Sequence, residues 1–459
     1  MLFNSLEFLY IFLPLTLGIF YLFARFRLIK LSKGTLLATS FAFYAYWKLS
    51  YFALIVFKII TNYFLAIYLN KNKTKLALWI GVIFNLGILV YFKYLNFFIE
   101  IFNHVIPLIP GTVSVTIPLG ISFYTFTQLT YLEDLYRGKA RFHGLQPYSL
   151  FVIFFPHLIA GPIVHYSQVM PQFSRLRTYV FQYKNFFTGV FLFLAGLFQK
   201  VVIADSVSHL ADMGFANASL LTFFEAWSSV LSYSMQIYFD FAGYSNMAIG
   251  LALLFNIRFP ENFNSPYQAE SVIDFWRRWH MTLSQFLRDY LYIRFGGNRF
   301  GLIRKYINIL LTMLIGGLWH GANWTFILWG AYHGILLVIN HIADEIKLKL
   351  PRILGRLITF AFVVYGWVFF RSANLNQIVD MSRALAGGHG FGLRNTYFLW
   401  KDQFLFLVIA LGIAWLAPNA NFWSQKIRPN LFWGFIFYFM FLLGLLCLNR
   451  ESAFLYFQF

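Results

Sequence analysis

A long run without charged side chains constrains this chain more than any other feature. Residues 306–343 contain no Asp, Glu, Lys or Arg and are predominantly apolar, the pattern of a segment that lies in a lipid bilayer. As one helix at about 1.5 Å per residue the run would be roughly 57 Å long, nearly twice a ~30 Å hydrocarbon core. It therefore predicts two spans, or one span and a broken, re-entrant segment. We expect the break at Gly316, Gly317 and Gly321, because glycine has low helix propensity.

One ionisable residue, His320, lies inside this expected break. It is far from both charged flanks, Lys305 and Asp344, and so at membrane depth. An ionisable group there is costly, which makes it a candidate functional residue; a neutral His hydrogen-bonded to another helix is the alternative. The neighbouring glycines allow a backbone or substrate to approach closely, while Asn323 and two tryptophans offer donors and ring faces. This setting favours a site that lines a cavity.

The composition assigns the whole chain to the membrane. Of its 459 residues, 59% are hydrophobic and 12% are charged, against about 25% charged in an average globular chain. Repeated long apolar runs argue for a helical bundle and against a barrel, whose strands are shorter and alternate. The net charge of +19 would suggest nucleic acid in a soluble protein, but here Lys and Arg in loops set the topology, so we expect membrane lipid and no nucleic acid. Cys447 is the single cysteine, which excludes an internal disulfide framework and a multi-Cys metal site.

The apolar runs predict an all-α polytopic membrane protein of roughly eleven membrane-embedded helices in a single domain, residues 1–459. The basic segments 25–33 and 70–75 should be cytoplasmic, which places the N-terminus outside, and 371–400 should be an outer loop. The first span is expected to be retained rather than cleaved as a signal. Short Gly-, Thr- or Pro-rich pieces at 117–141 and 148–164 favour broken or re-entrant helices. The remaining expected spans are about 6–24, 35–47, 51–69, 77–101, 184–204, 222–256, 354–370, 403–417 and 431–449.

The polar segment 276–299 carries a second histidine. Its large apolar residues recur at spacings of three and four, which predicts one amphipathic helix in the membrane interface. His280 shares the apolar face with Trp276, and a histidine at the lipid headgroups is the slightly favoured interpretation from these residues alone. The arginines at 277, 278 and 288 lie mostly on the other side. We expect them to bind lipid phosphates, with the phosphates of a nucleotide-like donor as the alternative.

Other candidates are weaker. Asp240 interrupts the apolar run 222–256, and a buried Asp must be paired or hydrogen-bonded, so structural pairing is favoured over substrate contact. His157 and His165 are more often packing residues than polar lining. His333 and His341 are too far apart for one metal, and no G-x-x-x-x-G-K-[ST], H-E-x-x-H or strand-borne G-x-S-x-G motif is present. We therefore expect no metal, no ATP hydrolysis and no metalloproteolysis.

Several blocks together resemble one family. They are DFAGYSNMAIGLALLFNIRFPENFNSPY, DFWRRWHMTLSQFLRDYLYIRFGGNR, GGLWHGANWTFILWGAYHG, AGPIVHY, WVFFR and the terminal YFQF. Together they resemble the membrane-bound O-acyltransferase family, especially its bacterial alginate O-acetyltransferase branch. The resemblance covers essentially the whole chain and keeps the order of the motifs. It implies tilted helices around a central funnel and acyl transfer from a thioester donor. The family's invariant histidine falls on His320 and its second characteristic polar position on His280.

The resemblance and the residues together give a mechanism. His320 is expected to deprotonate the acceptor hydroxyl, or to activate the residue that takes up the acyl group. Trp319 and Asn323 are expected to bind the oxyanion or orient the ring, and His280 to line the donor entrance. Trp276, Arg277 and Asp240 complete the candidate substrate-binding set.

The resemblance also implies the partners. Acetyl-CoA is the expected donor, with no tightly bound cofactor. A separate extracytoplasmic acetyltransferase is the expected partner, in the bacterial cytoplasmic membrane. Alginate-like exopolysaccharide, peptidoglycan and teichoic acid stay open as acceptors, and a secondary transporter or a non-catalytic scaffold is the competing class.

Overall fold

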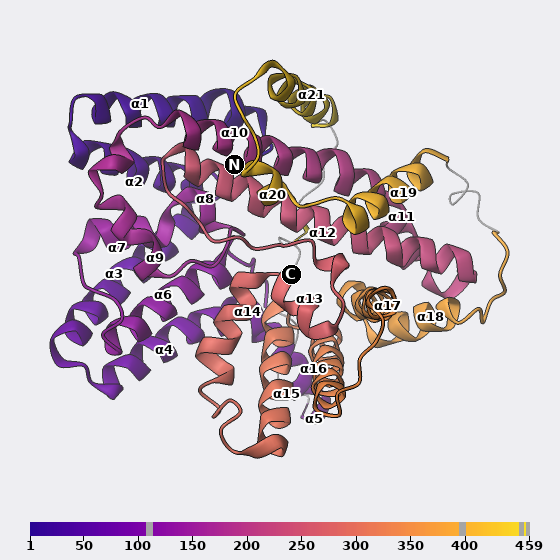
Figure 1. Cartoon of the computed structure of the whole chain (residues 1–459). Coiled ribbons are helices and arrows are strands. Elements are labelled where there is room, and N and C mark those ends of the chain that lie inside the picture. Colours follow the sequence, from indigo (N-terminus) through magenta and orange to yellow (C-terminus); the bar gives the residue numbers. More distant parts are fainter. Residues whose placement is uncertain (107–112, 394–400, 449–453, 456–459) are drawn as a thin grey trace. The chain divides into compact units, whose positions relative to one another are not determined.

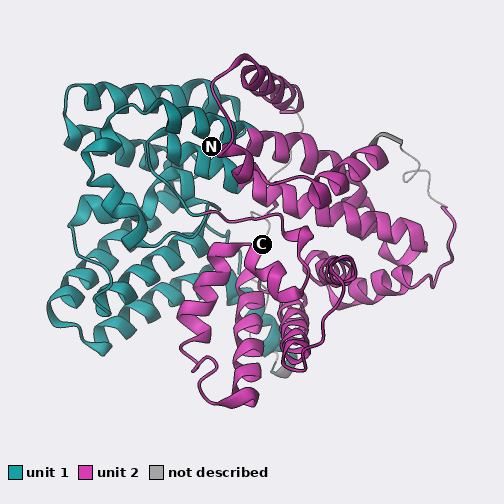
Figure 2. Cartoon of the chain, in the orientation of Figure 1, with its two compact units in different colours: residues 1–194, 245–260 teal, residues 195–244, 261–459 magenta. Residues whose placement is uncertain are grey.

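The computed structural model describes residues 1–106, 113–393, 401–448 and 454–455, and every regular element in these ranges is a helix (Figure 1). This confirms the all-α fold class. The chain divides into two compact units, residues 1–194 with 245–260 and residues 195–244 with 261–459 (Figure 2). Helices α10 (Tyr183–Phe198) and α12 (Phe223–Leu254) each continue from one unit into the other.

The first unit is a set of packed helices, and basic residues lie where α1 meets α2 and where α3 meets α4. Helix α1 packs on α2, α4 packs on α3 and α6, and α2 packs on α7. Its elements are the π-helix η1 (Phe8–Phe12), α1 (Leu13–Arg25), α2 (Ile29–Ala45), α3 (Leu49–Asn72), α4 (Lys75–Leu89), the π-helix η2 (Val90–Tyr94), α5 (Leu95–Val105), α6 (Ile121–Tyr136), α7 (Leu145–Ile153), α8 (Phe155–Leu158), α9 (Tyr166–Phe173) and the 3₁₀-helix η3 (Leu176–Tyr179).

The second unit contains both histidines expected at the site. Helix α16 packs on α13, α15 and α17, and α11 packs on α19. Besides parts of α10 and α12 its elements are the π-helix η4 (Gln199–Ala204), α11 (Asp205–Ala216), η5 (Ala218–Leu220), η6 (Pro266–Gln268), α13 (Val272–Arg278), α14 (Met281–Leu287), the π-helix η7 (Arg288–Tyr292), α15 (Gly301–His320), α16 (Trp324–Glu345), α17 (Arg352–Arg371), α18 (Leu375–Leu385), α19 (Lys401–Leu416), α20 (Ala420–Ser424) and α21 (Leu431–Cys447).

Among the described residues, 8 helices are long and apolar enough to cross a bilayer, so the chain is a multi-pass membrane protein. They are Phe8–Arg25, Leu49–Asn72, Lys75–His104, Tyr183–Ala216, Phe223–Leu254, Gly301–His320, Trp324–Glu345 and Arg352–Arg371. The apolar stretches Gln403–Leu416 and Leu431–Cys447 are shorter. The whole apolar window of α12 is buried by protein, so this helix meets other helices rather than lipid.

Buried polar side chains connect three helices of the first unit. Asn62 of α3 exchanges hydrogen bonds with Asn85 of α4, at 2.6 and 3.2 Å, and donates to Gln128 of α6 at 3.2 Å. The Lys58 ammonium group donates to the Thr125 hydroxyl over 2.6 Å. Such bonds satisfy polar groups that would otherwise be costly in an apolar interior, and they fix how these helices pack.

Two expected irregular segments are more regular than predicted. Helix α6 is continuous over its 16 residues, so a broken helix is wrong there. It is buried on nearly every side, and the Thr127 hydroxyl donates to the Phe123 carbonyl within the helix, which accommodates its polar residues. The expected outer loop 371–400 contains α18, whose first turn is capped by Asn374. Residues 394–400 of that loop, and the terminal YFQF, lie outside the described residues.

Candidate active site

The charge-free run forms a helical hairpin, which confirms two spans rather than one (Figure 1). Helices α15 and α16 are joined by a turn of three residues that begins at Gly321. At the other end of the hairpin, the Lys305 ammonium group and the Tyr306 hydroxyl donate to the Glu345 carboxylate at 2.9 and 2.7 Å. His320 is the last residue of α15 and therefore lies at the turn, away from the charged end.

Glycines hold the two helices of this hairpin close together. The helix break expected at Gly316 and Gly317 is wrong, because α15 continues through both residues and ends only before Gly321. A Cβ atom added to Gly317 would lie 2.3 Å from the Phe326 carbonyl oxygen, and one added to Gly330 would lie 2.3 Å from that of Met313. Glycine at these positions lets the backbones touch, a role that low helix propensity does not reveal.

His320 is enclosed by aromatic side chains. Its ring centroid lies 5.0 Å from those of Trp329 and Phe370 and 4.8 Å from that of Trp319, all three in edge-on geometry. The side chain of Phe326 covers Gly321, where an added Cβ would lie 2.1 Å from the ring. The residue is 5% exposed. The imidazole is thus held in place by packing, as a positioned catalytic group requires.

His280 is placed by a break that the sequence analysis did not predict. The expected single amphipathic helix over 276–299 is wrong: α13 ends at Arg278, α14 begins at Met281, and His280 between them has a left-handed φ of 42°. The residue is completely buried. It therefore lies inside the protein and not at the lipid headgroups.

Asn262 fixes the tautomer of His280. The Asn262 Oδ1 atom accepts hydrogen bonds from the backbone N–H and the hydroxyl of Thr282, at 3.3 and 2.9 Å, and lies 3.0 Å from His280 Nδ1. Because this oxygen only accepts, Nδ1 must carry the proton, and in the neutral ring Nε2 holds the lone pair. Burial lowers the pKa of His280 to about 3, so the ring is neutral at ordinary pH.

Trp319 brings the two predicted histidines together. Its ring centroid lies 6.2 Å from that of His280 and 4.8 Å from that of His320, and the indole is 5% exposed. The structure therefore joins three predicted site residues, from the end of α15 and the turn before α14, in one buried cluster. Two imidazoles beside a common indole can accept and return protons at one reacting centre.

A third buried histidine extends this cluster. His333 lies one helical turn after Trp329 on α16, and its ring is 4.9 Å from Trp329 and 5.3 Å from Trp276 of α13. It is fully buried, and neither ring nitrogen has a hydrogen-bond partner among the described residues. From the sequence, His333 stands out only as a poor metal ligand. The spacing of four residues from Trp329 was the available signal.

Two further predicted residues have different surroundings. The Asn323 side chain accepts from the Thr325 N–H at 3.0 Å, which caps α16, and donates to the Ala373 carbonyl at 2.9 Å. It therefore holds the turn after His320, and its contact with an oxyanion stays a prediction. Arg277 is exposed on α13 and forms no ion pair with a described residue, whereas the arginines at 278 and 288 pair with Asp274 and Asp289.

Asp240 is paired, as a buried carboxylate must be. Its Oδ1 atom lies 2.5 Å from the Lys200 ammonium nitrogen, which is also 2.9 Å from Asp205 Oδ1. The backbone N–H of Leu455 donates to its second oxygen over 3.2 Å. Its chain neighbour Phe241 packs edge-on against the His280 ring at 4.7 Å. The sequence does not reveal the pairing of Asp240 with Lys200, because no pattern connects positions forty residues apart.

Within the described ranges, no three His, Cys, Asp or Glu side chains gather as a set that could hold a metal ion. Imidazole, indole and amide groups supply the chemistry of the cluster, and these suit proton transfer and hydrogen bonding to an acyl group.

The fold and site define a multi-pass helical membrane protein with a buried histidine cluster. Residues 105–379 match the model described as MBOAT, membrane-bound O-acyltransferase family. The chain belongs to the membrane-bound O-acyltransferase family and is an acyltransferase. The matched region covers parts of both units and includes all seven predicted site residues.

Relatives with a named activity are similar over more than half of the chain. The peptidoglycan O-acetyltransferase of Helicobacter pylori is 43% identical over 427 residues, 86% of this chain and 81% of the relative. The probable alginate O-acetylase of Azotobacter vinelandii is 43% identical over 397 residues, 84% of this chain and 78% of the relative. The teichoic acid D-alanyltransferase of Bacillus subtilis is 30% identical over 276 residues, which are 55% of this chain and 68% of the relative.

Proposed function

We propose that this acyltransferase moves an acetyl group from a cytoplasmic thioester donor across the membrane, for O-acetylation of an extracytoplasmic glycan. Support comes from the two O-acetylating relatives, each 43% identical over more than four fifths of this chain. The D-alanylating relative is less similar and matches a shorter region, which favours acetyl over D-alanyl. Peptidoglycan and an alginate-like polysaccharide are the acceptors to test.

The observation that carries this proposal is the buried cluster of His280, Trp319 and His320. His320 is the general base: it takes the proton of the acceptor hydroxyl as that oxygen bonds to the acetyl carbonyl carbon. The carbon–sulfur bond then breaks, and the thiolate leaves with the proton held by the imidazolium ring. The Trp319 indole N–H stabilises the negative oxygen of the tetrahedral intermediate.

His280 is the second proton acceptor of the cluster. Asn262 holds the proton on Nδ1, so Nε2 is the ring nitrogen that can accept a proton. Burial keeps this ring neutral. We assign His280 to the path by which the thioester reaches the site, because its buried ring lies beside Trp319 in the cluster.

The proposed donor and location follow from the compartment in which acetyl thioesters are made. Acetyl thioesters are made in the cytoplasm, so acetyl-CoA is the proposed donor, and the proposed location is the bacterial cytoplasmic membrane. A separate extracytoplasmic acetyltransferase is the proposed partner that delivers the acetyl group to the glycan.

The first test measures donor cleavage by the purified chain. We expect acetyl-CoA to release free thiol in the presence of a hydroxyl acceptor, and His320→Ala to lower the rate about 10²- to 10⁴-fold, the usual contribution of a positioned base. His341→Ala is the matched control, because His341 is a partly exposed histidine near the charged end of the same hairpin. Equal rates for His320→Ala and the wild type would contradict the assigned base.

The second test identifies the acceptor. Base-labile acetate is measured in each envelope glycan of the wild type, a deletion strain and His320→Ala at equal membrane abundance. Loss of acetate from one glycan in both mutants names the acceptor. Normal acetate in His320→Ala with loss in the deletion strain would favour the scaffold. Accumulation of intact solute in vesicles would favour the transporter.

A further inference from the structure

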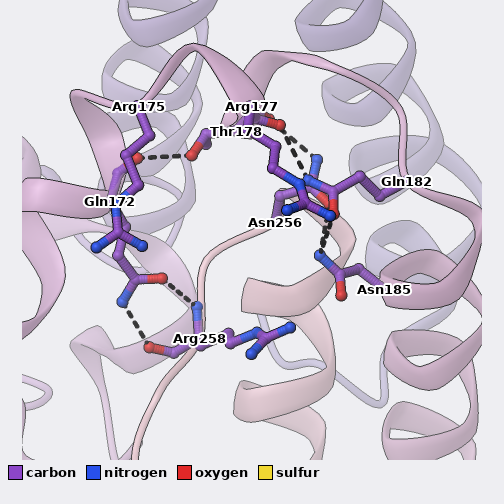
Figure 3. A pocket seen from close by; sticks show the side chains of 8 residues that line it. All are labelled: Gln172, Arg175, Arg177, Thr178, Gln182, Asn185, Asn256 and Arg258. Atoms are coloured by element: carbon purple, nitrogen blue, oxygen red, sulfur yellow. Dashed lines mark hydrogen bonds between the residues drawn. The ribbon is translucent and has the colours of Figure 1, made fainter.

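A polar cavity lies in the first unit, in a part of the chain to which the acyl-transfer chemistry assigns no role. Its volume is about 210 Å³. The lining residues come from α9, the loop after it, the first turns of α10 and the segment after α12 (Figure 3). They are Gln172, Arg175, Arg177, Thr178, Gln182, Asn185, Asn256 and Arg258.

Three arginines give this cavity its charge. Arg175 and Arg177 approach it from the loop after α9, and Arg258 approaches from the segment after α12 (Figure 3). No guanidinium group of the three donates a hydrogen bond to a described residue or lies within ion-pair distance of a described carboxylate. The cavity thus has a formal charge of +3 from three fork-shaped groups and no acidic lining residue.

The amide side chains hold the walls of the cavity in place. Asn256 has a left-handed φ of 60° and donates to the Thr178 and Val180 carbonyls at 3.0 and 2.9 Å, while its oxygen accepts from Asn185 at 3.0 Å. Gln172 exchanges two hydrogen bonds of 2.9 Å with the backbone of Arg258. The amide groups of Asn256 and Gln172 therefore form hydrogen bonds within the protein, whereas the three guanidinium groups can bind a ligand. Such pre-organised walls reduce the entropy lost on binding.

Exposed apolar side chains surround the basic groups. Leu176, Val180 and Tyr183 are 72%, 59% and 83% exposed, on the same loop and at the start of α10. Apolar and basic side chains together are typical of protein in contact with the headgroup region, where the apolar parts enter the acyl boundary. The Asn256 amide also donates a hydrogen bond to the Tyr21 hydroxyl at 3.3 Å. Tyr21 lies in the second half of α1, so the cavity is next to the basic turn after α1. By the positive-inside rule this is the cytoplasmic face.

We propose that this cavity binds a phosphate ester, and that its source is the headgroup of an anionic phospholipid in the cytoplasmic leaflet. Guanidinium groups bind phosphate oxygens in pairs of hydrogen bonds, and unpaired arginines around a cavity provide that geometry. The apolar rim favours the lipid over a soluble phosphate, because it would contact the acyl chains of the same molecule. The site is independent of the proposed acetyl donor and acceptor.

The test compares two pairs of substitutions of equal charge. Arg177→Gln with Arg258→Gln removes two guanidinium groups from the cavity. The hydrogen bonds between Gln172 and position 258 are retained, because they involve the backbone of Arg258 and not its side chain. Arg25→Gln with Lys30→Gln removes two exposed charges from the turn after α1, outside the cavity lining. Apparent melting temperature without ligand checks that both variants are folded.

Each detergent-purified variant is titrated with short-chain phosphatidylglycerol and, separately, with inorganic phosphate and adenosine 3′,5′-bisphosphate. Native mass spectrometry counts the bound molecules. We expect the cavity variant to bind phosphatidylglycerol about tenfold or more weakly than the wild type, and the control variant to bind normally. Selective loss of the soluble phosphates with normal lipid binding would overturn the lipid source. Equal binding by both variants to every probe would overturn the site.

Discussion

His280 occupies a backbone conformation that most side chains avoid, and this gives a clean way to test it. Asn is the residue with a side chain that best tolerates a left-handed conformation, so His280→Asn should keep the turn at φ 42° while removing the imidazole. We expect the melting temperature to change little and thiol release to fall about 10²-fold or more. The measurement is a steady-state rate with acetyl-CoA, beside a melting curve of the same preparation.

The matched comparison is His280→Ala, which removes the imidazole and also strains the turn. If His280 acts through chemistry, both variants lose activity and only the Ala variant loses stability. Full activity in a well-folded His280→Asn would restrict this residue to packing between Phe241 and Trp319.

The buried imidazole also predicts how stability depends on pH. The folded pKa of His280 is about 3, against 6.5 for an exposed histidine, so between these values the unfolded chain binds a proton that the folded chain does not. Stability is therefore retained above pH 6.5 and declines as the pH falls, by about 2 kcal/mol at a pH of about 5. The melting temperature of the wild type should fall more steeply on acidification than that of His280→Asn. Parallel curves would show that this ring titrates normally in the fold.

At the scale of elements, the hairpin of α15 and α16 determines where His320 lies. A methyl group at position 317 would meet the Phe326 carbonyl oxygen at 2.3 Å and Gly330 Cα at 3.0 Å, both backbone atoms that cannot rotate away. Gly317→Ala should therefore separate the helices three residues before His320. We expect the rate to fall about tenfold to a hundredfold, since small displacements of catalytic groups are costly. Thiol release and melting temperature are measured together.

Gly412→Ala is the control for that substitution. An added Cβ there meets nothing within 4 Å, so alanine in α19 should leave activity unchanged and raise helix stability by about 0.5–1 kcal/mol. A Gly317→Ala protein as active and stable as Gly412→Ala would mean that the hairpin adapts without moving the site.

These elements also define how far sequence reasoning reaches. Hydropathy predicts the spans, because length and composition alone decide what can cross a bilayer. It cannot tell a glycine that ends a helix from one that lets two helices touch, so Gly317 was misinterpreted. The turn at His280 is held by Asn262, and the carboxylate of Asp240 is paired with Lys200. Only the folded chain brings these partners close. His320 is a candidate from its place in the charge-free run alone, and the family resemblance adds a role for His280. Only packing shows that both rings lie beside Trp319.

At the scale of the whole molecule, the distribution of charge predicts the orientation of the chain in the membrane. Lys71 lies in the basic turn between α3 and α4, and Ser114 lies beyond the candidate span Lys75–His104, so the two must face opposite sides. Both positions are exposed, and Cys447 is the single cysteine, so Cys447→Ser provides a background without thiols. In that background we expect Ser114→Cys to react with an impermeant maleimide in intact cells. Lys71→Cys should react only after the membrane is opened.

This labelling pattern would also show which side of the membrane the arginine cavity faces. We expect the cavity on the same side as the basic turns after α1 and α3. Arg175→Cys should then be protected in intact cells as Lys71→Cys is, which agrees with a site for lipids of the cytoplasmic leaflet. If instead Lys71→Cys and Arg175→Cys are labelled from outside, the chain has the opposite orientation in the membrane to the one predicted. A cytoplasmic thioester would then enter from the side that contains Ser114, and the arginine cavity would face away from the cytoplasmic leaflet. Orientation therefore tests the lipid source proposed for the cavity without any assay of acyl transfer.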